Sequence, residues 1–254
     1  MIRPRIIPTL LIKGDGLVKT RRFKKPRYIG DPINAVKIFN SKEVDELVLL
    51  DISAGTESKG PNFNLIKNVS AEAFMPFGYG GGITHISEIE RLFHLGVEKV
   101  MLNSIAFYNS NIITSASDTY GSQSIVVSVD YKKRLFGGHN VYVDGGKHKV
   151  ATDLLEYVQL MEQYGAGEIL LTSIDNDGMM DGYDIEMIRR VSDAVKIPVI
   201  ANGGAGNIEH LHEAIKKGKS SAAAAGSMFI YNGVHRAVLI NYPEYEKLLE
   251  ITKN

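Results

Sequence analysis

Two glycine clusters carry the strongest chemical signal in this sequence of 254 residues. One covers residues 80–82 and the other residues 203–206, and each follows a short apolar run and precedes a segment of helical length. Backbone N–H groups that converge at the start of a helix bind phosphate, and glycine lets the chain approach such a ligand closely. Tight strand-to-helix turns also use glycine without any ligand, so one cluster would carry little weight.

Two clusters at corresponding positions of two chain halves predict two phosphate-binding sites. Each cluster has polar or small neighbours after the next apolar run, and these would complete the site. The residues expected there are Gly81, Gly82, Asn103 and Ser104 for the first phosphate, and Gly203, Gly204, Gly226 and Ser227 for the second.

Two aspartates, Asp51 and Asp130, each end an apolar run. In a parallel barrel, a carboxylate at the carboxyl end of a strand projects into the active-site mouth and can act as general acid or base. The alternative is an aspartate that caps the next turn. The loop at 175–178 adds two candidates, although Asp-Gly is also ordinary turn chemistry. We predict Asp130 as the catalytic group and, as further substrate contacts, Asp51, Thr172, Asp177, Gly178 and Asn202.

The composition excludes several classes of function. There is no cysteine, which excludes disulfides, thiol catalysis and cysteine-ligated metal. The seven histidines lack metal-ligand spacing, and no P-loop or dinucleotide glycine motif occurs, so we expect no metal and no cofactor. Basic and acidic residues number 29 each, so no global field attracts nucleic acid or an acidic membrane.

The sequence also shows no sign of a membrane or secretory segment. No apolar run approaches the roughly 20 residues that span a bilayer. The first residues lack the apolar core of a secretory signal. We therefore expect a cytoplasmic protein.

Eight short apolar runs, separated by segments of helical length, must position these residues. Strands that alternate with helices predict a parallel sheet, and eight of them predict closure into a (β/α)₈ (TIM) barrel of α/β class. The runs are Arg5–Ile12, Glu46–Ile52, Pro76–Tyr79, Lys99–Leu102, Ser124–Asp130, Glu168–Ser173, Pro198–Ala201 and Ser221–Ala225.

The two halves of the chain resemble each other. Residues 46–52 match residues 168–174, and residues 76–82 match residues 198–204, both at an offset of 122 residues. This period is too long for a solenoid repeat and predicts two homologous half-barrels. No linker interrupts the pattern, so we expect one domain over residues 1–254.

The stretch 14–30 is the longest predicted loop. It follows the first strand and contains Arg21, Arg22, Lys24 and Lys25. Two interpretations remain open: a solvated basic loop, or a mobile lid over an anionic substrate.

Along its whole length the chain resembles the cyclase subunit of imidazole glycerol phosphate synthase (HisF). The matching motifs are RIIP at 5–8, DELV at 45–48, LDI at 50–52, GGGI at 80–83, GSQ at 121–123, GAGEILLTS at 165–173, DGYD at 181–184, IPVIA at 197–201 and GGAG at 203–206.

The resemblance implies an activity and a partner. The family's enzyme receives ammonia from a glutaminase subunit through the barrel. It joins that ammonia to a bis-phosphorylated ribulosyl aminoimidazole carboxamide and cleaves the product. The resemblance places Lys19 in a loop over the mouth. It also places a charged ring at the bottom of the barrel, where the glutaminase docks and ammonia enters; the ring residues are Arg5, Glu46, Lys99 and Glu168.

One residue departs from the family pattern. The family's mechanism uses two aspartates, and Asp130 matches one, but Leu11 stands where the other belongs. Leucine cannot transfer a proton, and Asp15, four residues on, is poorly placed to replace the missing acid. The segments 19–32 and 60–63 look like a subgroup that converts an acetamido group on a nucleotide-linked sugar to an acetamidino group. Three readings therefore stay open: such an amidination subunit, a true histidine-pathway cyclase, and a non-catalytic ligand-binding activator of the glutaminase.

Overall fold

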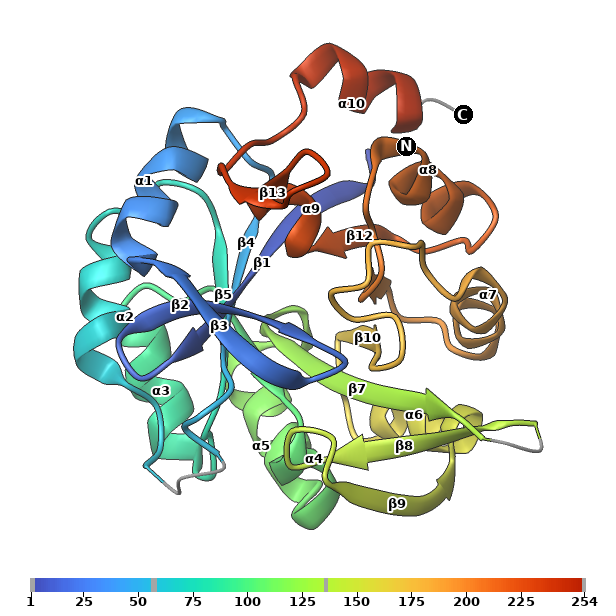
Figure 1. Ribbon diagram of the computed structural model, residues 1–254. Coiled ribbons are helices and arrows are strands. Elements are labelled where there is room, and N and C mark those ends of the chain that lie inside the picture. The colour runs from blue at the N-terminus through green and yellow to red at the C-terminus, as the bar shows by residue number, and fades with distance from the viewer. Residues whose placement is uncertain (1–2, 56–58, 135–136, 253–254) are drawn as a thin grey trace.

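Eight parallel strands close into a barrel in the computed structural model, which describes residues 3–55, 59–134 and 137–252 (Figure 1). Each strand pairs with its neighbour, and the last pairs with the first, so the predicted (β/α)₈ barrel is confirmed. All eight predicted runs form strands, including the alanine-rich one. In barrel order they are β1 (Arg5–Lys13), β4 (Leu47–Asp51), β5 (Phe77–Gly80), β6 (Lys99–Leu102), β7 (Ile125–Lys133), β10 (Glu168–Ser173), β11 (Val199–Asn202) and β12 (Ala222–Ala225).

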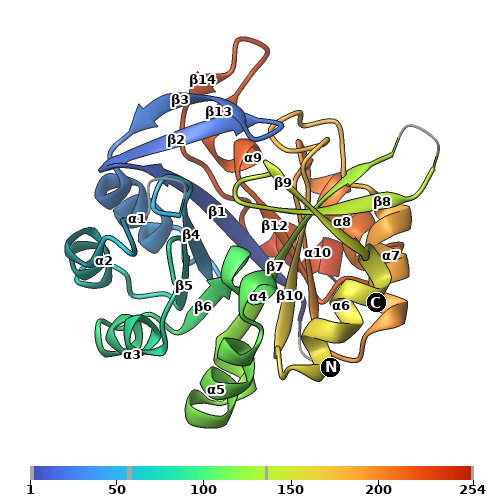
Figure 2. The same cartoon turned by 90° about the horizontal axis from the view of Figure 1, so that it is seen from below.

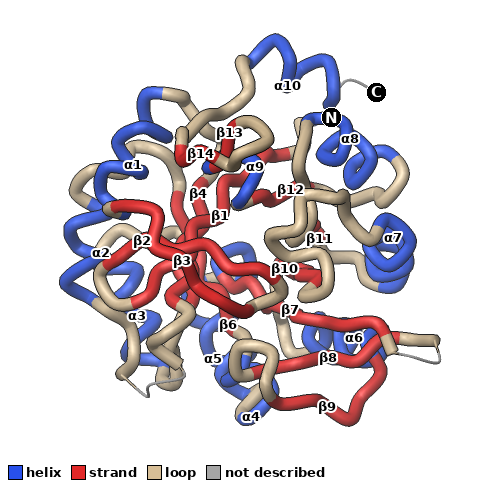
Figure 3. Tube along the Cα trace, viewed as in Figure 1, coloured by secondary structure: helices blue, strands red, loops and turns tan. Residues whose placement is uncertain are grey.

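Helices surround the barrel (Figures 1 and 3). Several begin at an Asp or Asn whose side chain accepts a backbone N–H of the first turn, as Asp31, Asn62, Asp184 and Asn207 do. The helices are α1 (Pro32–Ser41), α2 (Phe63–Ser70), α3 (Ile86–His94), α4 (Ser104–Tyr108), α5 (Asn111–Tyr120), α6 (Leu154–Gln163), α7 (Ile185–Ala194), α8 (Ile208–Lys216), α9 (Ser227–Ile230) and α10 (Tyr245–Thr252), with a 3₁₀ turn at Ser122–Ser124. None of the helices in the described ranges is long and apolar enough to cross a membrane.

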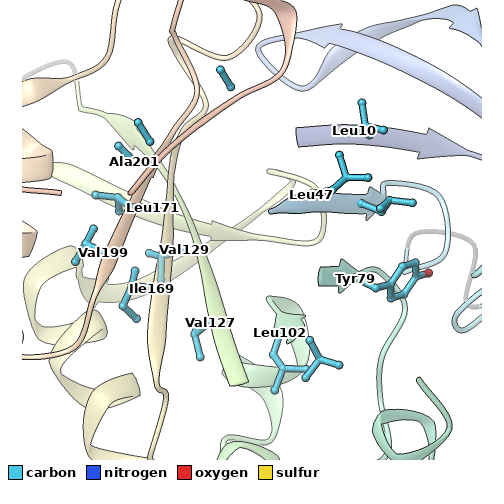
Figure 4. Close-up of a cluster of buried hydrophobic side chains, with 14 of the residues drawn as sticks. Leu10, Leu47, Tyr79, Leu102, Val127, Val129, Ile169, Leu171, Val199 and Ala201 are labelled. Atoms are coloured by element: carbon cyan, nitrogen blue, oxygen red, sulfur yellow. The ribbon is translucent and has the colours of Figure 1, made fainter. Parts of the chain in front are cut away.

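The strands separate two apolar layers because alternate side chains point to opposite faces. Outward-pointing residues such as Leu10, Val127 and Ile169 pack under the helices in one continuous core (Figure 4). Inward-pointing residues form a smaller cluster, which we call the inner cluster: Ile7, Val48, Leu50, Met101, Val126, Leu170, Ile200, Ala222 and Ala224. The barrel is therefore a filled core rather than a pore.

The prediction of a loop at 14–30 is wrong. The segment forms a hairpin of β2 (Gly16–Arg21) and β3 (Lys24–Gly30), and β2 pairs antiparallel with β1. The two residues at its tip, Arg22 and Phe23, have φ of 52° and 60°. Positive φ at both central positions is the geometry that two-residue hairpin turns require, but the usual Asn-Gly signal is missing from this sequence.

Two further sets of antiparallel strands were not expected from the sequence. Strand β7 runs beyond the barrel and pairs with β8 (His139–Val143), which pairs with β9 (His148–Asp153). A short pair, β13 (Tyr231–Asn232) and β14 (Ala237–Val238), follows α9. Hairpins β2–β3 and β13–β14 lie at one end of the barrel, and β1 begins toward the opposite end (Figure 2).

Candidate active site

A cavity of about 590 Å³ opens at the carboxyl ends of the barrel strands. Its wall includes the ends of the strands, the loops that follow them and the β2–β3 hairpin. All fifteen predicted catalytic and substrate-contact residues line it: Lys19, Asp51, Gly81, Gly82, Asn103, Ser104, Asp130, Thr172, Asp177, Gly178, Asn202, Gly203, Gly204, Gly226 and Ser227. The structure thus gathers residues that are up to 208 positions apart in the sequence.

Asp130 belongs to a hydrogen-bonded row of four side chains, one directly after β6 and one each on β7, β10 and β11. Asn103 Nδ2 donates to Asp130 Oδ2 at 3.2 Å, and the Thr172 hydroxyl also bonds the carboxylate. Asn202 Nδ2 donates in turn to Thr172 Oγ1 at 3.1 Å. Burial, with a smaller contribution from the negative charge of Asp177, raises the pKa of Asp130 to about 7, although the hydrogen bonds oppose the shift. A carboxyl with such a pKa can give or take a proton near neutral pH.

The wall opposite Asp130 is apolar. Leu11 and Leu50 pair with each other in the β1–β4 register and both line the cavity. Because β1 and β7 are the first and fifth of eight barrel strands, Leu11 and Asp130 lie on opposite walls. Asp15 is exposed, and its carboxylate accepts a hydrogen bond from Asn62 at 3.2 Å. Asp15 does not replace the missing acid.

Lys19 is buried rather than carried on an open loop. It lies in β2, and its Nζ donates to the Thr9 carbonyl at 2.8 Å. A Cβ atom on Gly226 would come within 2.1 Å of this Nζ, so Lys19 reaches the predicted second phosphate site. Burial lowers the pKa of the ammonium to about 8, while the Asp177 carboxylate opposes the shift.

Asp177 and Gly178 hold the hairpin over the mouth. Asp177 Oδ2 accepts the Thr20 hydroxyl at 2.9 Å, and the Asp177 carbonyl accepts the Arg22 N–H at 2.9 Å. The chain also packs so closely that a Cβ on Gly178 would lie 2.1 Å from the Thr20 carbonyl oxygen. Burial raises the pKa of Asp177, against the hydrogen bond from Thr20 and the charge of Lys19. These two residues line the cavity, and besides their contacts with the hairpin the Gly178 carbonyl accepts a hydrogen bond from Arg236 at 3.3 Å.

Asp51 caps its own turn, as the alternative interpretation held. Its Oδ1 accepts from the backbone N–H of Ser53 at 2.9 Å, from the Ser53 hydroxyl at 2.8 Å and from the N–H of Ala54 at 3.0 Å. A carboxylate oxygen with three donors is well satisfied without a ligand.

The same backbone contact requires a glycine in each of the two clusters. A Cβ on Gly81 would lie 2.5 Å from the Asp51 carbonyl oxygen, and one on Gly203 would lie 2.7 Å from the Ser173 carbonyl oxygen. The two pairs are related by the 122-residue offset. Close backbone approach alone therefore explains a glycine at these positions, and phosphate binding stays a prediction.

At the amino ends of the strands the four predicted ring residues form one ion-paired ring. Arg5 bonds both Glu46 and Glu168. Lys99 Nζ lies 3.1 Å from Glu46 Oε2 and 2.9 Å from Glu168 Oε2. The two glutamates are 3% and 4% exposed, so each cation neutralises two buried acids. The inner cluster separates this ring from the cavity.

Several cavity residues carried no motif. Tyr108, Asp144 and Lys147 come from α4 and the β8–β9 turn, and no sequence pattern marked that turn. Thr9 and Ser128 line the floor. Thr9 could have been predicted from the alternation of side chains along β1, because Arg5 and Leu11 point inward and Thr9 lies on the same face of the strand. Within the described ranges, no three His, Asp or Glu side chains converge as a metal would require.

Comparison with known proteins agrees with this architecture. The model of a family described as "Histidine biosynthesis protein" matches residues 5–236. A Pseudomonas aeruginosa protein provisionally named imidazole glycerol phosphate synthase subunit hisF2 is 49% identical over 98% of this chain and 99% of its own length. One from Vibrio vulnificus, provisionally named subunit hisF3, is 47% identical over 99% of this chain and 98% of its own length. Imidazole glycerol phosphate synthase subunit HisF of Geobacillus kaustophilus is 44% identical over 91% of this chain and 92% of its own length. The chain belongs to the histidine biosynthesis protein family and, within it, to the HisF-like subunits of imidazole glycerol phosphate synthase.

Proposed function

We propose that this chain is the synthase subunit that receives ammonia from a glutaminase partner and adds it to a phosphorylated substrate. The glutaminase docks at the amino-terminal face of the barrel, over the ring of Arg5, Glu46, Lys99 and Glu168. The substrate occupies the cavity at the other end, with its phosphates at the two glycine clusters. The chemistry has diverged from the parent cyclisation towards amidination of a nucleotide-linked sugar.

The observation that carries this divergence is the apolar wall opposite Asp130. In the parent mechanism, two carboxylates divide the proton transfers across the mouth. Here Asp130 has the raised pKa and the hydrogen-bonded support of a general acid or base, but it faces Leu11 and Leu50. The Asp51 carboxylate is engaged in its own turn. One of the two roles is therefore unfilled.

The ring supports delivery of ammonia. Burying two glutamates beside two partly buried cations costs desolvation free energy, and packed apolar side chains would stabilise a barrel at least as well. The ring lies between the outside and the inner cluster, which is the position that a gate for a small molecule would occupy. The alternation of charge around it offers both donors and acceptors to a molecule that passes.

The test is the rate of imidazole glycerol phosphate formation. The chain would be mixed with the bis-phosphorylated parent substrate and saturating ammonium salt, and the product measured by chromatography. Loss of one acid–base group typically lowers a rate by about 10²–10⁴-fold. We expect a rate at least 10²-fold below that of a family enzyme with both aspartates. Leu11→Asp should raise this rate, and Leu11→Asn, which restores polarity without a proton-transferring group, should not.

The main alternative is a working histidine-pathway cyclase, which the relative named HisF in Geobacillus kaustophilus favours. Near-normal turnover by the unmodified chain would establish that alternative and refute divergence. A non-catalytic activator would instead raise glutaminase activity when a phosphorylated ligand is present, with no ammonia incorporated into any product.

A further inference from the structure

A second cavity, of about 240 Å³, lies outside the barrel wall at the carboxyl end of β10; we call it the outer cavity. Ser173 and Asp175 line it, whereas their neighbours Thr172 and Asp177 line the active-site cavity. Because side chains alternate between the two faces of a strand, the segment after β10 separates the two cavities. A water molecule's share of liquid volume is about 30 Å³. The outer cavity therefore has room for a small organic molecule.

The wall of the outer cavity carries charges of both signs, from Lys133, Asp175 and Asp184. Asp175 Oδ2 accepts the backbone N–H of Lys133 at 2.9 Å, but the Lys133 ammonium forms no ion pair with any residue that the structure describes. Asp184 Oδ1 accepts the N–H of Met187 at 3.2 Å, at the start of α7. Each carboxylate thus uses one oxygen to hold the local backbone, and its second oxygen can bond a ligand.

A buried histidine stands behind this wall. His139 is 8% exposed, its ring packs edge-on against Tyr131 with centroids 5.4 Å apart, and its Nε2 lies 3.5 Å from Asp184 Oδ2. Neither ring nitrogen makes a hydrogen bond within the described part of the chain. Burial lowers the pKa of His139, although the Asp184 carboxylate opposes the shift. The imidazole is therefore neutral near neutral pH and does not offset the charge that Asp184 presents to the cavity.

We propose that the outer cavity binds a free α-amino acid. Its ammonium group lies between the carboxylates of Asp175 and Asp184, and its carboxylate lies toward Lys133, the most exposed of the three. The rings of Tyr131 and Tyr183 also line the cavity and can add cation–π attraction to the ammonium. A zwitterion suits this wall because one molecule supplies a partner for the acids and a partner for the base. A simple amine or a simple acid would leave one sign unmatched.

The outer cavity adjoins the contacts that hold the β2–β3 hairpin. Arg22 Nε donates to the Asp175 carbonyl at 3.1 Å, and the Arg22 N–H donates to the Asp177 carbonyl at 2.9 Å. A ligand that bonds the Asp175 side chain restrains the residue whose carbonyl holds Arg22. An amino acid in the outer cavity should therefore steady the hairpin over the active site, without entering that site.

The first test is isothermal titration calorimetry of the full chain with L-glutamine, whose polar side chain suits the lining residues Ser173 and Asn176. We expect glutamine to bind, and its two truncated forms to bind much more weakly. These are 4-aminobutanamide, which lacks the carboxylate, and glutaramate, which lacks the ammonium. Equal binding by either truncated form would overturn the amino-acid site. So would the absence of binding by glutamine and by every other common L-amino acid.

Charge-neutral variants locate the site. Asp175→Asn and Asp184→Asn keep an oxygen that can accept the same backbone N–H, so both should fold. Each should weaken glutamine binding about tenfold or more, because hydrogen bonds to charged groups are strong. Glu186→Gln is the matched control, since Glu186 is an exposed acid in the first turn of α7 that does not line the cavity. Unchanged binding in both aspartate variants, or an equal loss in the control, would overturn the proposal.

Proteolysis tests the link to the hairpin. Saturating glutamine should slow trypsin cleavage between Arg21 and Lys25 several-fold in the unmodified chain, but not in Asp175→Asn. Mass spectrometry of the peptides assigns the cleavage sites. Cleavage of the hairpin at the same rate with and without glutamine would overturn this link.

Discussion

At the scale of single residues, the site is asymmetric. Asp130 is embedded in polar neighbours from β10, from β11 and from Asn103, the residue directly after β6. Leu11 on β1 offers nothing but apolar surface. Burial, rather than a charge partner, is the largest cause of the raised pKa of Asp130. Because the pKa of Asp130 then differs between the folded and unfolded states, it can be measured through the pH dependence of stability.

The Asp130 carboxyl should lower stability as pH rises. Its folded pKa of about 7 exceeds the unfolded value, so the folded state holds the proton more tightly. The resulting stabilisation is fully present below about pH 4 and is lost as the pH rises to about 7, an upper limit of about 4 kcal/mol for three pKa units. Asp130→Asn removes this loss. Urea unfolding should therefore show the free-energy advantage of Asp130→Asn growing between pH 4.5 and pH 8. If the free-energy advantage of Asp130→Asn did not change with pH, the pKa of Asp130 would not be raised in the folded state.

At the scale of elements, the β2–β3 hairpin is the part that turns a barrel end into an enclosed cavity. Its docking depends on the loop after β10, through Asp177 and the close approach of Gly178 to Thr20. The hairpin in turn buries Lys19 against Thr9 and Gly226. The hairpin and the loop therefore hold each other in place, and they approach closely where the backbone of Gly178 meets Thr20.

Gly178→Ala should loosen the hairpin. A Cβ 2.1 Å from the Thr20 carbonyl oxygen, added at a φ of 69°, cannot be accommodated without movement. Strain of about 1–3 kcal/mol would raise the open population about 5- to 150-fold. Trypsin cleavage at the basic tip, Arg21 to Lys25, should speed up accordingly. Gly233→Ala is the control, with a φ of 68° but no atom within 4 Å. Equal cleavage rates in the two variants would show that the hairpin does not depend on this contact.

At the scale of the whole molecule, two polar regions lie at opposite ends of one filled barrel. The ring of Arg5, Glu46, Lys99 and Glu168 lies at the amino ends, the cavity lies at the carboxyl ends, and the inner cluster lies between them. Both half-barrels repeat the same close glycine contact, at Gly81 after β5 and at Gly203 after β11. A function that couples the two ends must act through the interior.

Lys99→Ala should separate the two nitrogen sources. Without Lys99, Glu46 and Glu168 lose one of the two cations that neutralise them. Removing one partner of a buried ion pair costs on the order of 3 kcal/mol, whereas the Lys219–Asp193 pair is exposed and screened by solvent. With a glutaminase bound, glutamine-dependent product formation should fall several-fold more than formation from added ammonium salt. Lys219→Ala should leave both unchanged. Equal losses under both nitrogen sources would identify the ring as structural only.

The sequence by itself determined the barrel, its two halves and most of the cavity wall. Strand periodicity and the 122-residue repeat are local or pairwise patterns, and a parallel barrel brings every strand's carboxyl end to one face. Any residue that ends a strand, such as Asp130 or Asn202, was therefore predictable as a wall residue. The resemblance added the ring, which the ion pairs of Arg5 and Lys99 confirm as an assembled structure.

Only the tertiary structure decided which of these residues are free to act. Asp51 and Asp177 looked like Asp130 in the sequence, but their hydrogen bonds hold a turn and a hairpin. The β2–β3 hairpin has no local turn signal, and it forms through pairing with β1 and docking on a loop more than 150 residues away. Such contacts join distant parts of the chain, and the free energy that selects them comes from closing the barrel, which no short stretch of sequence records.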